Sequence, residues 1–358
     1  MSILFENEYG WILSHSEYIK NVYKQTKYYD TIIDYEYKDK LFEINTAYLR
    51  TNQKPNGSVK VRKRNHATLT ENQTSIENDI RDVQNLYNLI SKDANIFEKS
   101  TTDIANEDAL KTAQECYTLS AGDHFLNMVA GNDSLSPIKM NRHDKNYIFP
   151  PKTLFYCKDV KEMLHWETND LFNIILMDPP WRNKYIRRKK SQVASHSYTM
   201  LFDEELKDLP IKKLLAKNGL VVVWCTNSPN HLNAILNDFF PKWNIKFLTK
   251  YYWLKVTKSG QPVCQFSPPS GKQPFEQIVI GINVLSDQQF SLNKRIIVSI
   301  PSALHSHKPP LTEIFKEFIQ ENSKCLEIFA RYLLPNWTSW GLEVCRFQHE
   351  SLFVTCKS

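Results

Sequence analysis

Asp178, Pro179, Pro180 and Trp181 directly follow the apolar run 173–177, and their types suit the binding of a planar amine. Prolines cannot continue the hydrogen-bond ladder of a strand, and the residue before a proline is extended. We therefore expect a strand to stop at Asp178 and to present a carboxylate, fixed carbonyls and an indole face. These groups offer two acceptors for an exocyclic amine and a stacking partner for its ring. The plain alternative is a buried strand ending in a proline turn, with Asp178 as a helix cap.

Further apolar runs predict the sheet that must position these residues. The continuous run Leu220–Cys225 is typical of a strand buried on both faces. Helices are expected over 203–217, with a break at Pro210 and a stop at Gly219, and over 229–240. The other expected strands are Thr153–Cys157, 245–256, 277–282, 295–300 and 324–331. This alternation predicts an α/β fold with a central, mostly parallel sheet covered by helices on both faces, and ligands bind at the carboxyl ends of such strands.

Composition limits the class of protein. The chain has 358 residues, enough for two domains, and a formal net charge of +6. It has no apolar run long enough to cross a bilayer and no signal-peptide pattern, which argues against a secreted or membrane protein. The seven cysteines are scattered and never form a Cys-x-x-Cys pair, so we expect reduced, mostly buried thiols. The positive charge permits a polyanionic partner without requiring one.

Residues 1–150 are interpreted as an α+β accessory domain that ends at the Pro150-Pro151 pair. A basic linker over 51–70 contains Lys60–Arg64, which is either a nuclear-localisation or phosphate-binding patch or a solvated loop. The capping box at 74–77 predicts a helix start. A second helix is expected over 106–119, and then an irregular crossing over 131–151. We see no catalytic group in this half.

The Asp-Pro-Pro-Trp sequence gives the chain a family resemblance that extends from about Phe155 to the C-terminus. It resembles the Asp-Pro-Pro-Trp (DPPW) adenine N6-methyltransferases, which use S-adenosylmethionine, and among them the branch called methyltransferase-like protein 4. The resemblance implies a Rossmann-like methyltransferase fold in permuted order, with the catalytic strand before the cofactor strand, over residues 151–358. It also implies that Asp178, Pro179, Pro180 and Trp181 form the catalytic segment.

The resemblance further implies a set of cofactor-binding residues. Lys308 belongs to a Ser-His-Lys-Pro motif ahead of a predicted amphipathic helix, where a lysine and a helix N-terminus make an anion site suited to the methionine carboxylate. Many members carry an asparagine where this chain has Leu342, which leaves the next residue as the ribose candidate. The complete cofactor set is Asp159, Val160, Asp178, Lys308, Glu327, Arg331 and Glu343. His305 and His307 have no third ligand at a suitable spacing, so no metal site is expected.

A basic loop follows the catalytic segment, and we interpret it as a contact for substrate phosphates. In the family an aromatic side chain of this loop covers the target base, which matches Tyr198, and a later loop flanks the base. A charge run taken alone is more often a solvated face. The expected substrate-binding residues are Arg182, Lys184, Arg187, Arg188, His196, Tyr198, Lys272 and Glu276.

The resemblance implies methyl transfer from S-adenosylmethionine to the N6 amine of adenosine in RNA. In this branch the substrate is 2′-O-methyladenosine of the U2 small nuclear RNA, and the expected location is the nucleus, with the cytosol as the alternative. DNA adenine as substrate, a non-catalytic nucleic-acid-binding subunit, and an amide or cytosine methyltransferase remain alternatives. We expect RNA as partner, either single-stranded or with the base flipped out, DNA as the alternative partner, no membrane, and no obligate protein partner.

Overall fold

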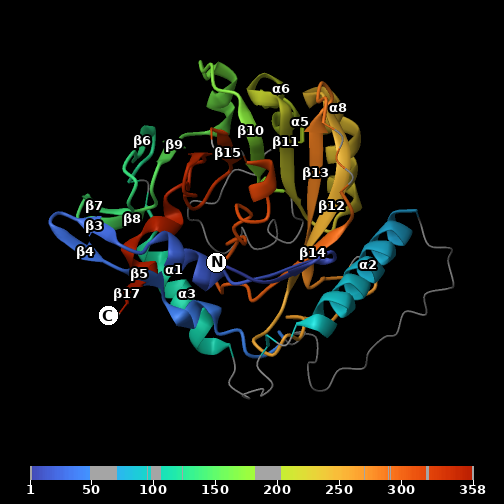
Figure 1. The fold of residues 1–358 in the computed structure, drawn as a ribbon, viewed down its shortest axis with the longest axis horizontal. Helices are drawn as coiled ribbons and strands as arrows, with labels where there is room; N and C mark the ends of the chain where they lie inside the picture. The colour runs from blue at the N-terminus through green and yellow to red at the C-terminus, as the bar shows by residue number, and fades with distance from the viewer. Residues whose placement is uncertain are drawn as a thin grey trace, which may run out of the picture.

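A computed structural model describes residues 2–48, 71–94, 96–97, 106–122, 124–181, 203–269, 271–288, 290, 292–319 and 322–356. Its centre is one sheet of eleven strands, drawn in Figure 1. Six of the ten neighbouring pairs are parallel, so the predicted mostly parallel α/β sheet is confirmed. In spatial order the strands are β1 (Ile3–Asn7), β2 (Gly10–Leu13), β14 (Arg295–Ser299), β12 (Ile245–Lys255), β13 (Phe275–Asn283), β11 (Leu215–Cys225), β10 (Phe172–Met177), β15 (Cys325–Ile328), β16 (Trp337–Trp340), β9 (Thr153–Cys157) and β6 (Met128–Asn132).

The middle of the sheet is formed by β10, which has β11 on one side and β15 on the other, both parallel to it. The predicted catalytic strand, β10, therefore lies beside a strand that comes about 150 residues later, as the resemblance implied. β13 runs antiparallel to both β11 and β12. Because of this reversal, β13 begins at the edge where its neighbours end. That edge collects side chains from the ends of parallel strands and from the start of β13.

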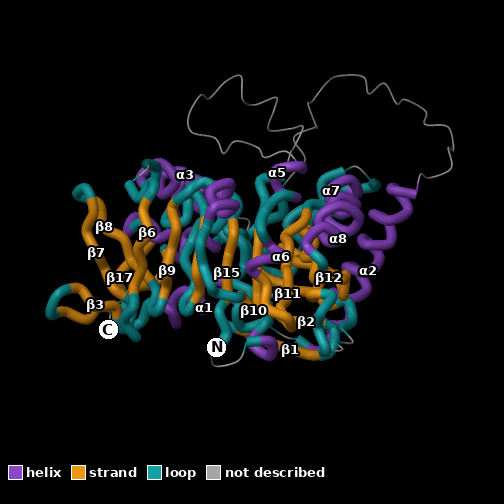
Figure 2. Tube along the Cα trace, turned by 90° about the horizontal axis from the view of Figure 1, so that it is seen from above, coloured by secondary structure: helices purple, strands orange, loops and turns teal. Residues whose placement is uncertain are grey.

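Helices cover one face of the sheet. The described helices are α1 (His15–Val22), α2 (Glu71–Asp93), α3 (Glu107–Leu119), α5 (Asp203–Lys207), α6 (Ile211–Leu214), α7 (Pro229–Ala234) and α8 (Phe240–Trp243), with a π-helical turn η3 (Ile235–Phe239) joining the last two. A core cluster places residues of α5 to α8 against β10, β11 and β15. α2 packs farther along on the same face, against β2, β12 and β14. Figure 1 shows α2 beside β14 and β12, and Figure 2 shows α5, α7 and α8 together along the row of strands.

The opposite face is covered by α1 and by the connection 300–319. Leu311, Ile314 and Phe315 from that connection are buried against β10, β11 and β12. The predicted amphipathic helix of this stretch is wrong, because it holds turns and one short 3₁₀ helix, η4 (Lys316–Phe318). The other 3₁₀ helices are η1 (Asp39–Phe42), η2 (Val160–His165), η5 (Arg346–Gln348) and η6 (Glu350–Leu352). The apolar side chains of the connection are buried as predicted, although the backbone is not helical.

The N-terminal residues contribute three strands to the central sheet: β1, β2 and β6. The predicted irregular crossing over 131–151 is wrong, because that stretch holds part of β6 and the hairpin of β7 (Ile138–Arg142) and β8 (Lys145–Phe149). This hairpin forms a second sheet with β3 (Thr26–Tyr28) and β4 (Thr31–Ile33), while β5 (Tyr35–Tyr37) pairs with β17 (Phe353–Thr355). The boundary at residue 150 stays a prediction. The linker 51–70 lies outside the described residues.

Two expected helix boundaries differ from the structure. α2 begins at Glu71, so the residues 74–77 lie inside the helix instead of capping it. The helical stretch expected to reach residue 217 ends at Leu214, and Gly219 lies within β11. α3 runs from Glu107 to Leu119, which agrees with the expected range 106–119 to within one residue. In both wrong cases a local signal was outweighed by neighbouring residues that continue a helix or a sheet.

The seven cysteines are free thiols, as expected, and six of them are buried. None of the helices in the described ranges is both long and apolar enough to cross a membrane.

Candidate active site

A row of polar side chains lines one face of the sheet along its carboxyl edge. Each of them lies two residues from a buried residue of the core beneath the 300–319 connection, and residues two apart in a strand share a face. The row runs across six strands, and its members are Ser299, Lys255, Glu276, Asp178, Glu327 and Ser339. Asp178, Glu276 and Glu327 were picked out from the sequence, and Lys255 forms an ion pair with Glu276. The fold therefore gathers the predicted chemistry at one edge.

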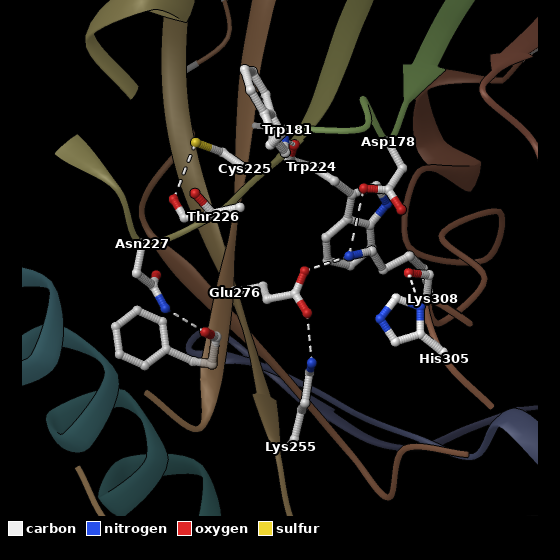
Figure 3. Close-up of polar contacts among 12 residues, drawn as sticks. Asp178, Trp181, Trp224, Cys225, Thr226, Asn227, Lys255, Glu276, His305 and Lys308 are labelled. Atoms are coloured by element: carbon white, nitrogen blue, oxygen red, sulfur yellow. Dashed lines mark hydrogen bonds and ion pairs between the residues drawn. The ribbon is translucent and has the colours of Figure 1, made fainter. Parts of the chain in front are cut away.

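Asp178 stands immediately after β10, as the proline-stopped strand predicts. Its backbone N–H donates to the carbonyl of Ile328 on β15 at 3.4 Å, and its side chain is 22% exposed. Burial raises the pKa of the carboxyl, while the cations of Lys308 and Arg331 oppose the shift and favour the ionised acceptor form. The side chain is turned toward Lys308, as Figure 3 shows.

Lys308 connects two carboxylates. Its ammonium donates to Glu276 Oε2 and lies 3.5 Å from Asp178 Oδ1. It also lies over the ring of Trp224, 5.1 Å from the centroid. Burial lowers the pKa of the ammonium, but the two acids outweigh it and raise the pKa overall. No helix directly follows Lys308, so a helix dipole does not contribute to the predicted anion site. The positive charge of Lys308 itself is the remaining attraction for an anion.

The resemblance implied Glu276 as a pocket acid, and the antiparallel direction of β13 brings this residue to the carboxyl edge of the sheet. It is the second residue of β13, opposite Trp253 near the end of β12. Its Oε1 lies 2.5 Å from Lys255 Nζ, and its Oε2 accepts from Lys308. Burial would raise the pKa of this carboxyl, but the two ammonium groups hold it well below its usual range. Glu276 is therefore an ionised acceptor between two cations.

Glu327 lies on β15, opposite Leu176 of β10, and is 7% exposed. Burial and the neighbouring Asp178 raise the pKa of its carboxyl to about 8. Its Oε2 is buried and has no hydrogen-bond partner among the residues that the structure describes, and the same holds for the hydroxyl of Ser339, which stands opposite it on β16. Buried polar atoms are normally paired, so two adjacent unpaired ones mark a place built for a polar ligand or water.

Trp181 corrects the expectation of a free aromatic face. Its indole is 8% exposed and stacks on His231 of α7 with 4.8 Å between ring centroids. Its N–H donates to the carbonyl of Trp224 on β11 at 2.8 Å. Figure 3 shows the ring pointing away from Lys308. Trp181 therefore fastens the segment to the sheet instead of offering a surface to a base. Its own backbone N–H donates to the Pro179 carbonyl at 2.7 Å, which leaves that oxygen a second lone pair.

Residues 172–343 match the model of the MT-A70 family, a stretch that begins with the first residue of β10. The chain is 34% identical over 281 residues to the N(6)-adenine-specific methyltransferase METTL4 of Homo sapiens, covering 74% of this chain and 55% of that protein. The METTL4 of Mus musculus is 35% identical over 64% of this chain and 50% of its own length.

The chain belongs to the MT-A70 family.

A third relative matches nearly end to end. The DNA N6-methyl methyltransferase of Caenorhabditis elegans is 28% identical over 92% of this chain and 96% of its own length. The N6-methyladenosine RNA methyltransferase MTA1 of Pyricularia oryzae is 32% identical over 59% of this chain and 58% of its length. By contrast, the chain spans about half the length of the two mammalian relatives. The similarity to the METTL4 branch agrees with the resemblance in the sequence.

In this MT-A70 protein the expected ribose residues meet. Arg331 donates to Glu343 Oε2 at 3.1 Å, and Arg346 donates to Glu343 Oε1 at 2.9 Å. Leu342, beside them, is 38% exposed. Asp159 lies outside the family match and caps η2 in a capping box with Glu162, which was the plain alternative for an acid after a strand.

The remaining predicted residues divide into three groups. Val160 is 6% exposed and belongs to the core under α5 to α8. Lys272 is exposed and lies over Tyr48, 5.8 Å from its ring centroid, without a contact to the row of polar side chains. The basic loop is outside the described residues, and with it Arg182, Lys184, Arg187, Arg188, His196 and Tyr198.

No cluster of three His, Cys, Asp or Glu in the described parts of the chain could hold a metal ion. His307 is buried and bonds to Ser302 at 2.8 Å, whereas His305 is exposed and bonds to Ser306. The two side chains therefore have different surroundings. This pair is interpreted as part of the loop that carries Lys308.

Sequence reasoning missed Lys255 and His231. Lys255 was read as part of a strand, although a charged residue at the end of an apolar strand was the signal that Asp178 had also given. His231 bonds to Thr226 at 2.6 Å and stacks on Trp181. No local pattern announced that contact, because it joins two elements 50 residues apart.

Proposed function

We propose that this MT-A70 protein transfers a methyl group from S-adenosylmethionine to the N6 amine of adenine in a nucleic acid. The observation that carries the proposal is the carboxylate of Asp178, held at the carboxyl edge of the sheet by a proline-stopped strand, with Lys308 against it. All four relatives described above are named for N6-methylation: of adenine for the two mammalian proteins, of adenosine in RNA for the Pyricularia oryzae protein, and of DNA for the Caenorhabditis elegans protein. Membership of the family supports the use of S-adenosylmethionine.

The exocyclic nitrogen of adenine is a poor nucleophile because its lone pair is delocalised into the ring. Asp178 and the Pro179 carbonyl would accept its two hydrogens and turn the lone pair out of the plane of the ring. Both acceptors are fixed, since Pro179 and Pro180 restrict the backbone and Trp181 anchors it to β11. The gain comes from orientation and fixed dipoles. After transfer the amine loses a proton, for which Asp178 is the adjacent acceptor.

The residues fit the amino-acid end of the cofactor, which carries an ammonium and a carboxylate. Lys308 would bind the carboxylate, and Asp178 and the unpaired Glu327 Oε2 would accept from the ammonium. Asp159, Arg331 and Glu343 would hold the adenosine end, as the resemblance implies, whereas Val160, which the resemblance also placed there, is buried in the core. When bound, S-adenosylmethionine supplies a methyl group on a sulfonium that is open to attack. No metal takes part in this scheme.

We further propose RNA as the substrate, and specifically the N6 amine of 2′-O-methyladenosine in the U2 small nuclear RNA, giving N6,2′-O-dimethyladenosine. The support is the resemblance to the METTL4 branch, together with the RNA methyltransferase named in Pyricularia oryzae. A stacked base cannot reach a carboxylate at the edge of a sheet, so the adenine must be single-stranded or flipped out. The residues of the basic loop that follows Trp181 would then neutralise the phosphates.

DNA adenine is the second candidate. It is favoured by the Caenorhabditis elegans relative, which matches 96% of its own length and is named a DNA methyltransferase. RNA and DNA strands of one sequence, with and without a 2′-O-methyl group on the target adenosine, would be compared for methyl transfer. Faster transfer to the 2′-O-methylated RNA supports the first candidate. Equal or faster transfer to DNA favours the second.

The central test replaces Asp178 with alanine and with asparagine. Methyl transfer to an adenine-containing strand is measured by mass spectrometry of the nucleosides, and binding of S-adenosylhomocysteine by calorimetry. Asp208→Asn is the matched control, because it removes a carboxylate from an exposed ion pair with Lys242. We expect both Asp178 variants to lose at least about a hundredfold in rate, the scale of removing one fixed acceptor from a transition state.

Wild-type activity equal to that of Asp178→Ala would overturn the assignment of Asp178. A wild type that binds nucleic acid but neither binds the cofactor nor transfers methyl would instead make the chain the non-catalytic subunit that the sequence left open.

A further inference from the structure

The Glu276 carboxylate pairs with two lysines at once, through different oxygens. Oε1 lies 2.5 Å from Lys255 Nζ, and Oε2 accepts from Lys308. Lys308 in turn lies 3.5 Å from Asp178. Figure 3 shows Glu276 between the two lysines, with Asp178 beyond Lys308. The four groups alternate in charge, and the two ammonium groups balance the two carboxylates.

The two lysines differ in how firmly the surrounding structure holds their backbone. Lys255 is the last residue of β12, which is paired on both sides with β13 and β14. Its ammonium lies 4.4 Å from the ring centroid of Trp253, a residue of the same strand that is 2% exposed. Lys308 comes from the 300–319 connection, where neither helix nor strand fixes the backbone around it. The side chain that can change partner with less disturbance is therefore Lys308.

The proposed function asks Lys308 to bind the carboxylate of an amino-acid ligand. In doing so the lysine weakens or loses its contact with Glu276. A carboxylate shielded from water is strongly disfavoured without a counter-ion, so this exchange would be blocked if Glu276 had no second partner. Lys255 is that partner, and it approaches from the opposite side, where it does not compete with the ligand.

We propose that Lys255 is a positioning residue: it is the standing counter-ion of Glu276, and it lets Lys308 leave Glu276 to bind the carboxylate of the ligand. The inference rests on the proposed function, because the ligand is the methionine end of S-adenosylmethionine. It adds a residue that the sequence did not assign to the site. It also gives Glu276 a stable ionised state in both the free and the loaded protein.

The surroundings of Glu276 give this inference a measurable consequence. Burial acts to raise the pKa of the carboxyl, and Lys255 and Lys308 together hold it low. Without Lys255, drawing Lys308 to the ligand leaves burial as the main influence, and Glu276 takes up a proton. The other titratable groups near Glu276 or its lysines are Asp178, Arg331, His305, His15 and the Cys225 thiol.

The test is calorimetric titration of the full chain with S-adenosylhomocysteine, from about pH 6 to about pH 9, in buffers of different ionisation enthalpy. The buffers report how many protons are taken up on binding. Between the pKa of Glu276 in the free variant and its pKa in the loaded variant, we expect Lys255→Met to take up about one proton more than the wild type and its affinity to fall about tenfold per pH unit. Lys255→Arg should behave as the wild type, since it keeps the charge.

Three further variants separate this role from a structural one. Lys246→Met removes another lysine of β12, one whose side chain is exposed, and should leave proton uptake unchanged. The double variant Lys255→Met with Glu276→Gln should lose the extra proton uptake, because the acid is gone. Lys255→Gln is a second neutral variant, used if Lys255→Met melts at the assay temperature.

The outcomes are distinct. A wild type that binds no S-adenosylhomocysteine defeats the proposed function and this inference together. A wild type that binds, beside a Lys255→Met or Lys255→Gln protein with the same proton count, defeats the inference alone. Extra uptake that persists in the double variant also defeats it, because another group would then be the one that titrates.

Discussion

The indole N–H of Trp181 donates to the backbone carbonyl of Trp224 at 2.8 Å. The bond joins the segment after β10 to the end of β11, and stacking on His231 adds a contact with α7. At the other end of the segment, the N–H of Asp178 donates to Ile328 on β15. The segment Asp178–Trp181 is thus attached to the strands on both sides of β10. This attachment explains why an aromatic residue ends the motif although its ring is buried.

Trp181→Phe should lower stability more than it alters chemistry. Phenylalanine keeps a ring against His231 but loses the N–H that bonds to Trp224, which costs about 1–2 kcal/mol. Trp181→Ala leaves a cavity where the indole was and should lower the free energy of unfolding by about 3–5 kcal/mol. Urea unfolding and methyl transfer would be measured on the same preparations. A Trp181→Phe protein of unchanged stability that no longer transfers methyl would show that the indole contacts the substrate directly.

Glu327→Gln should change how stability depends on pH. Burial and Asp178 raise the pKa of Glu327 to about 8 in the folded chain, whereas the pKa of an unfolded glutamate is about 4.3. Between these values the unfolded state binds fewer protons, so wild-type stability falls as pH rises, by at most about 1.4 kcal/mol per pH unit from this group. Glutamine removes this contribution. Urea unfolding from about pH 5 to about pH 8 should show the stability of Glu327→Gln rising relative to that of the wild type as pH rises. Parallel curves of unfolding free energy against pH would contradict the raised pKa of Glu327.

Leu342→Asn should tighten cofactor binding. Many relatives of the DPPW family carry asparagine at this place, and Leu342 is 38% exposed, so its replacement leaves no hole in the core. One new hydrogen bond contributes about 1 kcal/mol, equal to about a fivefold gain in affinity. Calorimetry with S-adenosylhomocysteine measures the change. Leu342→Ala is the control, which shortens the side chain without adding an amide. Equal affinity for the two variants would mean that position 342 does not reach the cofactor.

Asp79→Ala should destabilise the whole sheet, although α2 lies outside the family match. Asp79 is 4% exposed and accepts from Lys250 at 2.5 Å and from the Tyr252 hydroxyl at 2.7 Å, both on β12. Removing one half of a buried pair costs about 3–5 kcal/mol. On the same helix, Asp82→Asn opens the more exposed pair with Lys294 and should cost less than about 1 kcal/mol. Thermal unfolding, monitored by the circular dichroism of the whole protein, would compare the midpoints of Asp79→Ala and Asp82→Asn. Equal midpoints would refute the proposal that α2 stabilises the sheet.

The sequence predicted the central strands and the position of Asp178 because both depend on local signals. A run of apolar residues requires burial on both faces, and a proline ends a strand wherever the strand lies. The same reasoning placed β12, β13, β14 and β15 to within about three residues, and it placed the end of β11 at Cys225, although β11 begins at Leu215, five residues before the expected start. It was wrong for the helix after Lys308, because an amphipathic spacing of Leu311, Ile314 and Phe315 is also produced by turns that pack on a sheet.

Pairing across the sheet was beyond local signals. The resemblance picked out Glu276, yet its contact with Lys255 arises because β13 runs antiparallel and begins where β12 ends. From the sequence alone, Trp181 is expected to be an exposed aromatic, because its contacts with β11 and α7 come from residues distant in the chain. Strand type and strand end follow from neighbouring residues in the chain, whereas the partner of each charge follows from which strands become neighbours in space. That choice is made by the burial of the whole sheet, so only the tertiary structure revealed the alternating row Lys255, Glu276, Lys308 and Asp178.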